Sequence, residues 1–393
     1  MRAERRARLR SIDSMQRANE PSPSEMPDRE IKRALLSWYA ATGARAARDL
    51  PWRGTRDPYA IWVSETMLQQ TRVATVVPYW KRFLEALPTV RSLAEAREDQ
   101  VLALWSGLGY YRRARMLHSA AKDVVARHGG RLPQQTSGLL ALDGVGKYTA
   151  GAIASIAFDE RAAAVDGNVA RVLARLFAIE EDVTGADGSA RVWAVAARLA
   201  AVDEGKPGDW TQALMDLGAT VCLPQEPECT QCPVRGQCKA LARGAVGDLP
   251  RKKAKRAPTE VRSVAIVLAS RAAILLALRQ PDTLFGGLWE VPQEAWTAGS
   301  LRDALRELAN RLGVAPAALS VRGEIVHILS HRKMRVTVFC GRLDGRRSFA
   351  LPGPDYSAIE KVPLSELRRH TRPHATLTRK LLDMANVPWN RLR

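Results

Sequence analysis

The chain has 393 residues, 46% of them hydrophobic, and a formal net charge of +19 at pH 7. No apolar run approaches the ~20 residues of a membrane helix, and no basic segment with an apolar core opens the chain, so we expect neither membrane association nor a secretory signal. A charge this positive favours a polyanionic partner, above all nucleic acid, although an arginine-rich genomic composition would give the same value. We therefore expect a cytoplasmic, nucleoid-associated bacterial protein of two or three domains.

The spacing of apolar residues divides the chain into a helical half and a β-rich half. Residues 1–27 are basic and polar and predict a disordered extension. Between residues 28 and 245, apolar residues recur at a spacing of three to four, which predicts a helical domain. Its clearest expected helices lie at residues 30–42, 74–87, 92–105, 115–128 and 191–202.

A second, α+β domain is predicted at residues 260–393, after a basic, proline-flanked linker at residues 246–259. β-branched residues and alternating polarity favour strands there, and one helix is expected around residues 300–312. The strands are expected at residues 261–270, 272–280, 323–330 and 334–343.

One carboxylate stands on an apolar helical stripe. In the segment IWVSETMLQQ, residues 61–70, the side chains of Ile61, Trp62 and Leu68 share the helix face of Glu65. An acid in such surroundings costs stability unless it is paired or kept neutral, and burial raises its pKa. Glu65 is therefore either a general acid or a buried acid satisfied by arginine or backbone, and the residues alone leave both readings open.

Four of the five cysteines lie close together, as Cys222, Cys229, Cys232 and Cys238. Their spacing, C-x6-C-x2-C-x5-C, contains one CxxC pair with longer arms, whereas zinc sites usually join two separated CxxC pairs. This spacing favours a loop around a [4Fe–4S] cluster over a structural zinc ion. The fifth cysteine, Cys340, falls in an expected strand and is predicted to belong to the core.

A glycine-rich turn precedes a helix in LDGVGKYTAGAI, residues 142–153. Gly144 and Gly146 flank Val145, and the amide groups of such a turn can bind an anion together with the N-terminus of the next helix. The segment lacks the spacing and the Lys-Ser/Thr pair of a nucleotide P-loop. A plain turn between two helices is the alternative, but the preceding helix and the basic charge favour a phosphate-binding hairpin.

These segments together resemble the helix–hairpin–helix DNA glycosylase superfamily, and within it the MutY-type adenine DNA glycosylases. The resemblance rests on WVSETMLQQTRV, GLGYYRRAR, LDGVGKYTAGAI, AVDGNVARVLAR and the four-cysteine loop, and it spans residues 31 to 238. It implies a mainly α-helical glycosylase domain whose four cysteines hold a [4Fe–4S] cluster. It also implies a monomer that acts on double-stranded DNA carrying adenine opposite 8-oxoguanine or guanine, in base excision repair.

The resemblance implies catalytic roles for three residues. Glu65 matches the family's general acid, which protonates adenine N7 and later activates water, and Asp166 matches the carboxylate that stabilises the sugar cation. The helix N-terminus should keep Asp166 ionised, although an ordinary N-cap would have the same sequence. Tyr148 stands where endonuclease III-type relatives carry the lysine that cuts the strand, and Lys147 is rotated from it by about 100°. We therefore expect a monofunctional glycosylase.

Other residues match the family's contacts to DNA and to the flipped base. Gln70 and Tyr110 match the wedges that fill the gap in the base stack, although ordinary packing is the alternative for each. The remaining base-binding candidates, in the segments RDLPWR, AVDGNVARVL and TQALMDLGA, are Arg48, Leu50, Trp52, Arg53, Asn168 and Gln212.

The second half resembles a Nudix fold without its metal chemistry. In the metal-binding pattern R-E-x-x-E-E-x-G, this chain has Asn310 and Arg311 in place of two acids, so divalent-metal binding is not expected. In MutY-type enzymes such a domain reads 8-oxoguanine through a Phe-Ser-His segment. Here the segment is Leu329, Ser330 and His331, and the leucine cannot stack as an aromatic ring would.

Three rival hypotheses are a glycosylase/lyase of the endonuclease III type, a non-catalytic DNA-binding protein with a cluster, and a nucleotide hydrolase. Tyr148 and the second domain disfavour the first hypothesis. Asn310 and Arg311 disfavour the third.

Overall fold

The computed structural model describes residues 26–41, 50–253, 257–281, 283–296, 299–329, 332–344, 348–350, 354–368 and 372–389. The chain forms two compact units. The first combines the described residues up to Glu65 with Leu132–Lys253, and the second combines Thr66–Arg131 with the described residues after Lys253. Within the described ranges, no helix is both long and apolar enough to cross a membrane.

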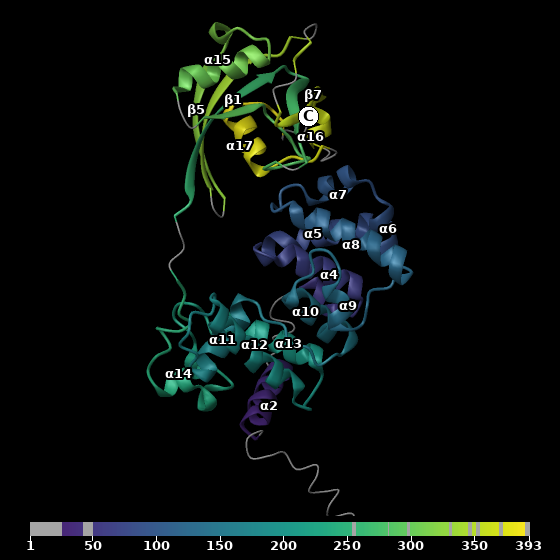
Figure 1. The fold of residues 1–393 in the computed structure, drawn as a ribbon, viewed down its shortest axis with the longest axis vertical. Coiled ribbons are helices and arrows are strands. Elements are labelled where there is room, and N and C mark those ends of the chain that lie inside the picture. The colour runs from purple at the N-terminus through teal and green to yellow at the C-terminus, as the bar shows by residue number, and fades with distance from the viewer. Residues whose placement is uncertain are drawn as a thin grey trace, which may run out of the picture. The chain divides into compact units, whose positions relative to one another are not determined.

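Helices build the first unit (Figure 1). Its long central helix α13 begins with proline at its first turn, where a missing N–H costs nothing, and packs against α2, α10 and α11. The elements are α2 (Met26–Ala41), η1 (Pro51–Gly54), α4 (Pro58–Leu68, which continues into the second unit), α9 (Thr136–Leu140), α10 (Lys147–Phe158), α11 (Gly167–Phe177), α12 (Ala186–Ala201), α13 (Pro207–Thr220), η2 (Cys229–Gln231), η3 (Arg235–Gln237) and α14 (Lys239–Ala242).

The helical part of the second unit corrects one expectation. Residues 92–105 do not form a single helix, because Ala96 and Arg97 are extended, with ψ of 150° and 148°. Thr89 starts the first of the two resulting helices through a capping box, and the acids at the first turn of the next helix favour its own N-terminus. The helices of this part are α5 (Val73–Ala86), α6 (Val90–Glu95), α7 (Glu98–Trp105) and α8 (Arg112–His128).

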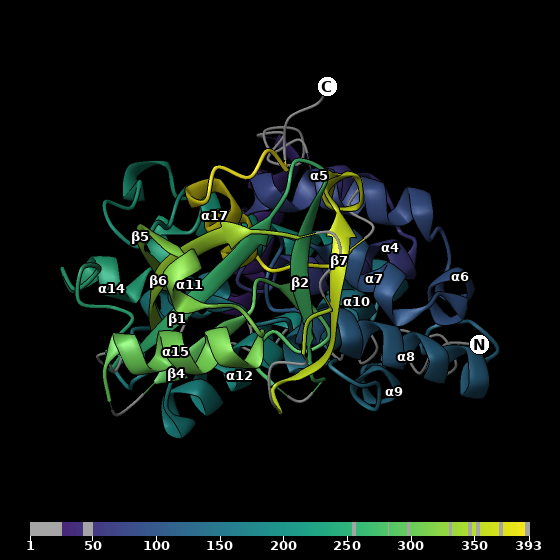
Figure 2. The same cartoon turned by 90° about the horizontal axis from the view of Figure 1, so that it is seen from above.

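The β-rich part of the second unit is one mixed sheet with helices on both faces (Figures 1 and 2). Its strands follow the order β3-β2-β1-β6-β5, with β4 paired to β1 and β7 paired to β2. Only the β1–β6 pair is parallel among the named pairs of the described sheet. The elements are β1 (Thr259–Ala269), β2 (Ala273–Arg279), β3 (Trp289–Glu290), β4 (Gln293–Trp296), α15 (Leu301–Arg311), η4 (Pro316–Ala318), β5 (Ser320–Ile328), β6 (Arg332–Arg342), β7 (Tyr356–Pro363), α16 (Leu364–Arg368) and α17 (Thr376–Met384).

Strand β1 shows how alternation builds two cores. Val264, Ile266 and Leu268 pack with the buried face of α15, whereas Ala265 and Val267 pack with α16 and α17 on the other side. Successive side chains of a strand point to opposite faces, so an almost wholly apolar strand is buried on both. The expected α+β fold of this half is therefore confirmed.

Two of the predicted domain boundaries can be compared with the elements that the structure describes. Helix α2 begins at Met26, and residues 1–25 lie outside the described residues. At the start of the predicted linker, Leu249 is 3% exposed and its carbonyl accepts a hydrogen bond of 2.8 Å from Arg175 Nε. The first residues of this segment therefore belong to the packed helical unit, and β1 begins at Thr259.

Candidate active site

Glu65 is a buried residue whose carboxyl group accepts a hydrogen bond from a tyrosine. It lies in the second half of α4, 5% exposed, beside the buried Ile61 and Trp62. The Tyr148 hydroxyl, from the first turn of α10, donates a hydrogen bond of 2.5 Å to Glu65 Oε2. Burial raises the pKa of Glu65, and the bond from Tyr148 opposes that rise only in part. Among the described residues, no lysine, arginine or histidine forms an ion pair with this carboxyl.

Asp166 is the N-cap of α11. Its Oδ1 accepts hydrogen bonds from the backbone N–H groups of Asn168 and Val169, at 2.9 and 2.7 Å. These two bonds favour the ionised form of Asp166, as expected at a helix N-terminus, but burial outweighs them and raises its pKa. The charge of Asp166 also raises the pKa of Glu65. Burial of both carboxyls and the charge of Asp166 therefore disfavour ionising the two groups together.

A hydrogen-bonded chain connects Asp166 with the cysteine loop. Asn168 Nδ2 donates to Asp166 Oδ2 at 3.3 Å, and its Oδ1 accepts from Arg171 Nη2 at 3.0 Å. Arg171 also donates to the carbonyl oxygens of Gly218 at 2.7 Å and Cys222 at 2.8 Å. Sequence reasoning missed Arg171, although an arginine inside the apolar stripe of α11 was a usable signal.

Gly218 brings α13 against the start of α11. A Cβ atom at this position would lie 2.7 Å from Asn168 Cβ and 3.1 Å from Asn168 O. Only glycine fits at such a distance without a shift of the neighbouring backbone. The position of Asn168, and through it that of Asp166, depends on this close approach.

An ion pair and an amide lie on one face of α13. Asp216 is 1% exposed, and its Oδ1 accepts from Arg53 Nη2 at 2.9 Å. One turn earlier, Gln212 is 7% exposed and its Oε1 accepts from the Tyr39 hydroxyl at 3.1 Å. Sequence reasoning found Arg53 and Gln212 but missed Asp216 and Tyr39. The i,i+4 spacing of Gln212 and Asp216 was the signal for the acid.

Of the remaining candidates in the RDLPWR segment, the structure describes two and not the third. Leu50 and Trp52 are buried around η1, which carries Arg53. Arg48 lies outside the described residues. The electrostatic influence of Arg53 lowers the pKa of Glu65, so this segment and the carboxyl belong to one site.

The predicted hairpin lies between α9 and α10. Gly144 has a φ of +73°, which favours glycine, Val145 is buried, and Gly146 is the N-cap of α10. The first N–H groups of α10 have no partner within the helix, as in any helix, so the geometry of an anion site is present. Lys147 is exposed while its neighbour Tyr148 contacts Glu65, in agreement with the expected rotation.

The two predicted wedge residues lie in the second unit. Gln70, just after α4, and Tyr110, just before α8, are both exposed. Their φ angles, +58° and +49°, fall in the left-handed region that non-glycine residues rarely adopt. Such strain is maintained only where surrounding contacts enforce it.

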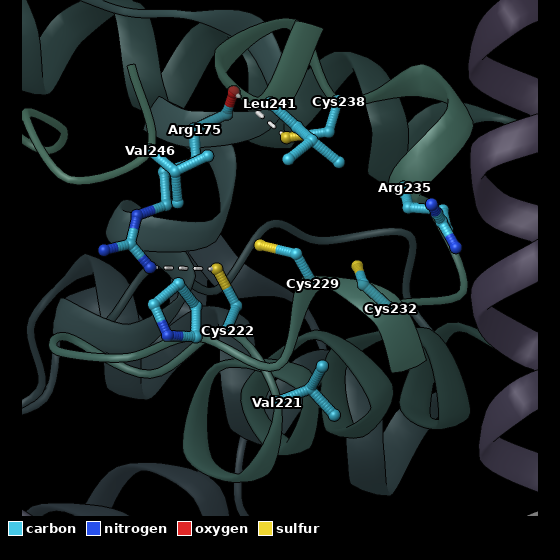
Figure 3. A pocket seen from close by; sticks show the side chains of 10 residues that line it. Arg175, Val221, Cys222, Cys229, Cys232, Arg235, Cys238, Leu241 and Val246 are labelled. Carbon is cyan, nitrogen blue, oxygen red and sulfur yellow. Dashed lines mark hydrogen bonds between the residues drawn. The ribbon is translucent and has the colours of Figure 1, made fainter. Parts of the chain in front are cut away.

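The four clustered cysteines line one pocket (Figure 3). Their sulfur atoms point into a shared space whose empty volume, open solvent included, is about 320 Å³, with Arg175 and Arg235 among the other lining residues. Arg175 Nη1 donates to Cys222 Sγ at 3.4 Å, and Cys238 Sγ donates to Arg175 O at 3.6 Å. Burial raises the pKa of Cys232 to about 11 and raises that of Cys238, so without a metal these thiols hold their protons.

The spread of the sulfur atoms bears on what the pocket can hold. Within the described part of the chain, no three cysteine, histidine or carboxylate side chains converge as ligands of a single ion. The donor set, four thiols around one pocket, fits a [4Fe–4S] cluster, and Arg175, bonded to Cys222 Sγ, would offset part of its negative charge. Cys340 takes no part, because it packs against the sheet core.

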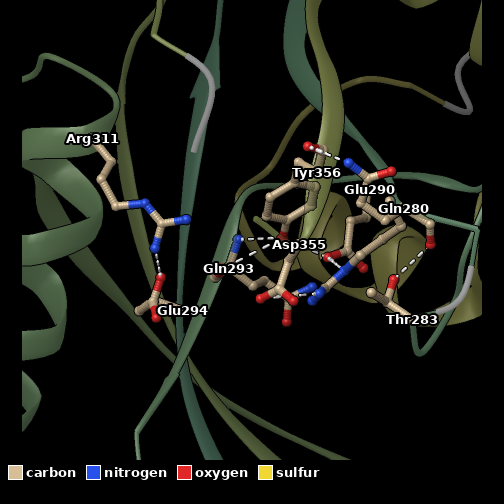
Figure 4. A network of polar contacts seen from close by, with 9 residues as sticks. Gln280, Thr283, Glu290, Gln293, Glu294, Arg311, Asp355 and Tyr356 are labelled. Carbon is tan, nitrogen blue, oxygen red and sulfur yellow. Dashed lines mark hydrogen bonds and ion pairs between the residues drawn. The ribbon is translucent and has the colours of Figure 1, made fainter. Parts of the chain in front are cut away.

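A different polar network occupies the β-rich part (Figure 4). Glu290 is 1% exposed, and its Oε1 accepts from Arg279 Nε and from the Tyr356 hydroxyl, each at 2.7 Å. On α15, Arg311 forms an ion pair with Glu294, so a cation neutralises an acid near the helix where Nudix enzymes bind metal.

The predicted reading segment lies at the turn between β5 and β6. Leu329 is partly buried and packs against the sheet core, and its N–H donates to Arg332 O at 2.8 Å. Ser330 and His331 lie outside the described residues.

Comparisons with known proteins agree with this architecture. Residues 63–198 match the family described as HhH-GPD superfamily base excision DNA repair protein, and residues 263–384 match the NUDIX domain family. The chain is 40% identical to the adenine DNA glycosylase of Mus musculus over 384 residues, which cover 83% of this chain and 73% of that protein. It is 40% identical to the adenine DNA glycosylase of Homo sapiens over 371 residues, 80% of this chain and 67% of that protein.

Among solved structures, a thermostable thymine-DNA glycosylase is 29% identical and aligns with a TM-score of 0.49, covering 56% of this chain and 99% of its own. The expected fold, a helix–hairpin–helix glycosylase domain followed by a Nudix-like domain, is confirmed. The chain belongs to the adenine DNA glycosylases and is a DNA glycosylase, a hydrolase of N-glycosyl bonds.

Proposed function

We propose that this enzyme removes adenine mispaired with 8-oxoguanine or guanine in double-stranded DNA, as a monomeric, cytoplasmic, monofunctional glycosylase of base excision repair. One observation carries the proposal: a buried Glu65 whose pKa burial raises, bonded to Tyr148 and electrostatically coupled to a second carboxyl, Asp166. The names of the relatives, adenine DNA glycosylases, support adenine as the base.

The pair of carboxyls suits the chemistry of an N-glycosyl bond. Glu65 gives its proton to N7 of adenine, the bond between C1′ and N9 breaks, and its electron pair leaves with the base. The ionised Asp166 stabilises the positive charge that develops on the sugar. Glu65, now a carboxylate, takes a proton from the water whose oxygen attacks C1′, which restores the acid for the next turnover.

Tyr148 supports the absence of strand cleavage by the enzyme itself. A lyase needs an amine that forms a Schiff base with the sugar, and a phenol cannot form one. The nearest amine in sequence, on Lys147, is exposed rather than directed at Glu65. We therefore expect an intact abasic site as the product.

Recognition of adenine draws on Gln212 and on the Arg53–Asp216 pair. With its Oε1 held by Tyr39, the amide of Gln212 keeps its N–H groups for an acceptor atom of the base. Leu50 and Trp52 supply apolar surface around η1. Together these groups provide the few placed polar contacts and apolar walls that a base pocket needs.

The cysteine pocket fits a [4Fe–4S] cluster held by Cys222, Cys229, Cys232 and Cys238. When bound, the cluster supplies iron–thiolate bonds that fix this loop. The loop in turn carries the Cys222 carbonyl that Arg171 bonds, so its order bears on Asp166. We expect about four iron atoms per chain, lost in Cys232→Ser and retained in Cys340→Ser, with zinc in their place as the contrary result.

The Nudix-like domain is the proposed reader of 8-oxoguanine. The ion pair of Arg311 with Glu294 supports loss of metal-dependent hydrolysis on α15. Leu329, Ser330 and His331 are the proposed reading segment. Because leucine offers no aromatic stacking, we expect discrimination against guanine to rest on polar contacts.

The deciding experiment uses labelled duplexes with adenine opposite 8-oxoguanine, guanine, thymine or cytosine. We expect free adenine from the first two, strand breaks only after hot alkali, and no borohydride-trapped adduct with an abasic duplex. Glu65→Gln is expected to bind the first duplex without releasing adenine. Strand cleavage without alkali, or excision of a pyrimidine instead of adenine, would refute this assignment.

A further inference from the structure

A single arginine connects the two exposed, left-handed residues of the second unit. Gln70 and Tyr110 lie about forty residues apart in sequence, and each has a backbone conformation that costs free energy. Arg113, in the first turn of α8, donates hydrogen bonds to the segments that carry both.

On the first side, Arg113 caps the C-terminus of α4. Its Nη1 donates to the carbonyl oxygens of Thr66, Met67 and Gln69, at 2.8, 2.9 and 2.5 Å. These carbonyls lie at the C-terminal end of α4, where the negative end of the helix dipole attracts a cation. Its Nη2 donates to Thr71 Oγ1 at 3.1 Å, so the bonds bracket Gln70 on both sides.

On the second side, the same guanidinium holds the segment of Tyr110. Nη2 donates to Gly109 O at 3.2 Å, and the carbonyl also accepts from Trp105 Nε1 at 3.1 Å. The guanidinium carbon lies 5.3 Å from the ring centre of Tyr110 and 5.4 Å from that of Trp105. These distances allow cation–π attraction to both rings.

The side chain keeps its charge in this position. Burial lowers the pKa of Arg113 to about 10, which still leaves it protonated at neutral pH. A lysine would also be charged, but its ammonium is one point with three donors and cannot reach five acceptors on two segments. The planar fork of arginine is therefore the feature that the geometry uses.

We propose that Arg113 is a positioning residue that holds Gln70 and Tyr110 as one rigid element, so that both enter the base stack together. The inference rests on the proposed function, in which these residues fill the gap left by the flipped adenine. A wedge that is already ordered pays no conformational entropy on entering the duplex. Loss of Arg113 should therefore impair flipping rather than the bond-breaking step.

The first test compares three variants in single-turnover release of adenine opposite 8-oxoguanine. Arg113→Gln is expected to slow release by about 10- to 100-fold, and Arg113→Lys to restore little of it, because misplacement rather than charge is the defect. Arg82→Gln is the matched control: Arg82 also donates to a carbonyl, that of Leu104 at 2.9 Å, and lies over an aromatic ring at 4.6 Å, but touches neither segment. It is expected to retain the wild-type rate.

A double-mutant cycle separates positioning from a general loss of structure. If Arg113 acts through the wedge, Arg113→Gln should add little to the loss in Tyr110→Ala, whereas independent effects would multiply. In a Glu65→Gln background, which halts excision, 2-aminopurine opposite 8-oxoguanine should brighten on binding, and Arg113→Gln should suppress that rise at saturating protein.

Failure of the role of Arg113 and failure of the proposed function give different results. Rescue by lysine, an equal loss in Arg82→Gln, or multiplied losses in the double variant would overturn the role of Arg113. Absence of adenine release from the wild-type enzyme would instead refute the proposed function, which the same assay measures first.

Discussion

Two buried glutamates, each bonded to a tyrosine hydroxyl, differ in their cationic partners. Glu65 in α4 and Glu290 in β3 are 5% and 1% exposed, and each accepts a hydrogen bond from a tyrosine hydroxyl, at 2.5 and 2.7 Å. Burial raises the pKa of both. The difference is the third partner: Arg279 contacts Glu290 at 2.7 Å, whereas Arg53, the cation that influences Glu65, is bonded to Asp216 instead.

This contrast indicates that contact with a cation, and not burial alone, separates the proposed acid Glu65 from the glutamate of an ion pair. Arg279, in contact with Glu290, opposes the rise in its pKa that burial causes and forms a structural ion pair with it. Withholding that cation leaves a carboxyl that is costly to ionise and ready to donate. In the candidate active site, Arg53 forms its ion pair with Asp216, whereas Arg279 forms its ion pair with Glu290.

The largest expected difference comes from amide replacements of the two acids. Glu65→Gln should lower single-turnover release of adenine by about 10²- to 10⁴-fold, because the amide carries no transferable proton. Glu290→Gln should leave that rate unchanged and instead lower the free energy of unfolding by up to about 3–5 kcal/mol, because Arg279 loses its counter-charge. Rate assays and urea unfolding of both variants test the contrast, and equal rate losses would contradict it.

A smaller effect is expected from removing the two tyrosine hydroxyls. The bond from Tyr148 lowers the pKa of Glu65, so Tyr148→Phe should raise that pKa further. Release needs protonated Glu65 and falls as pH rises through its pKa, so the alkaline limb of the pH–rate profile should move to higher pH.

The matched variant Tyr356→Phe should leave the pH profile in place. It should lower the free energy of unfolding by about 1–3 kcal/mol, because Glu290 loses one of its two donors. A limb that stays fixed or moves to lower pH in Tyr148→Phe would refute the assignment of Glu65 as the titrating acid.

The smallest expected effect concerns α15, the helix that corresponds to the metal-binding helix of Nudix enzymes. Replacing Asn310 and Arg311 together by glutamate should make the C-terminal domain responsive to Mg²⁺, since Glu294 would then face added carboxylates instead of a cation. At millimolar Mg²⁺ we expect a rise of a few degrees in Tm for the variant, below about 3 kcal/mol of stabilisation, and none for the parent. A comparable response of the parent chain to Mg²⁺ would show that this helix still binds metal.

Sequence reasoning located features whose signal is local. The acid on the apolar stripe of α4 and the cysteine spacing each occupy one short segment, and the structure buries the first and gathers the second in one pocket. The break between α6 and α7 was missed because the extended residues there, Ala96 and Arg97, are not accompanied by a proline or glycine that would mark it in the sequence. Strands β3 and β4 have two and four residues, too few to show alternation.

The missed site residues depend on contacts between distant segments. Asp216 matters because Arg53 reaches it, and Arg171 matters because Asn168 and the Cys222 carbonyl lie on either side of it. The raised pKa of Asp166 could not be foreseen for a related reason, because burial depends on the tertiary fold, which an N-cap motif does not report.

The bare α-carbon of Gly218 makes this glycosylase fragile to a very small inherited change. A single added methyl group would press on Asn168, which donates a hydrogen bond to Asp166, while every charged side chain stayed in the sequence. We expect such a variant to fold and to keep its cysteine pocket, so that a screen for folding would pass it, while its glycosylase activity is lost.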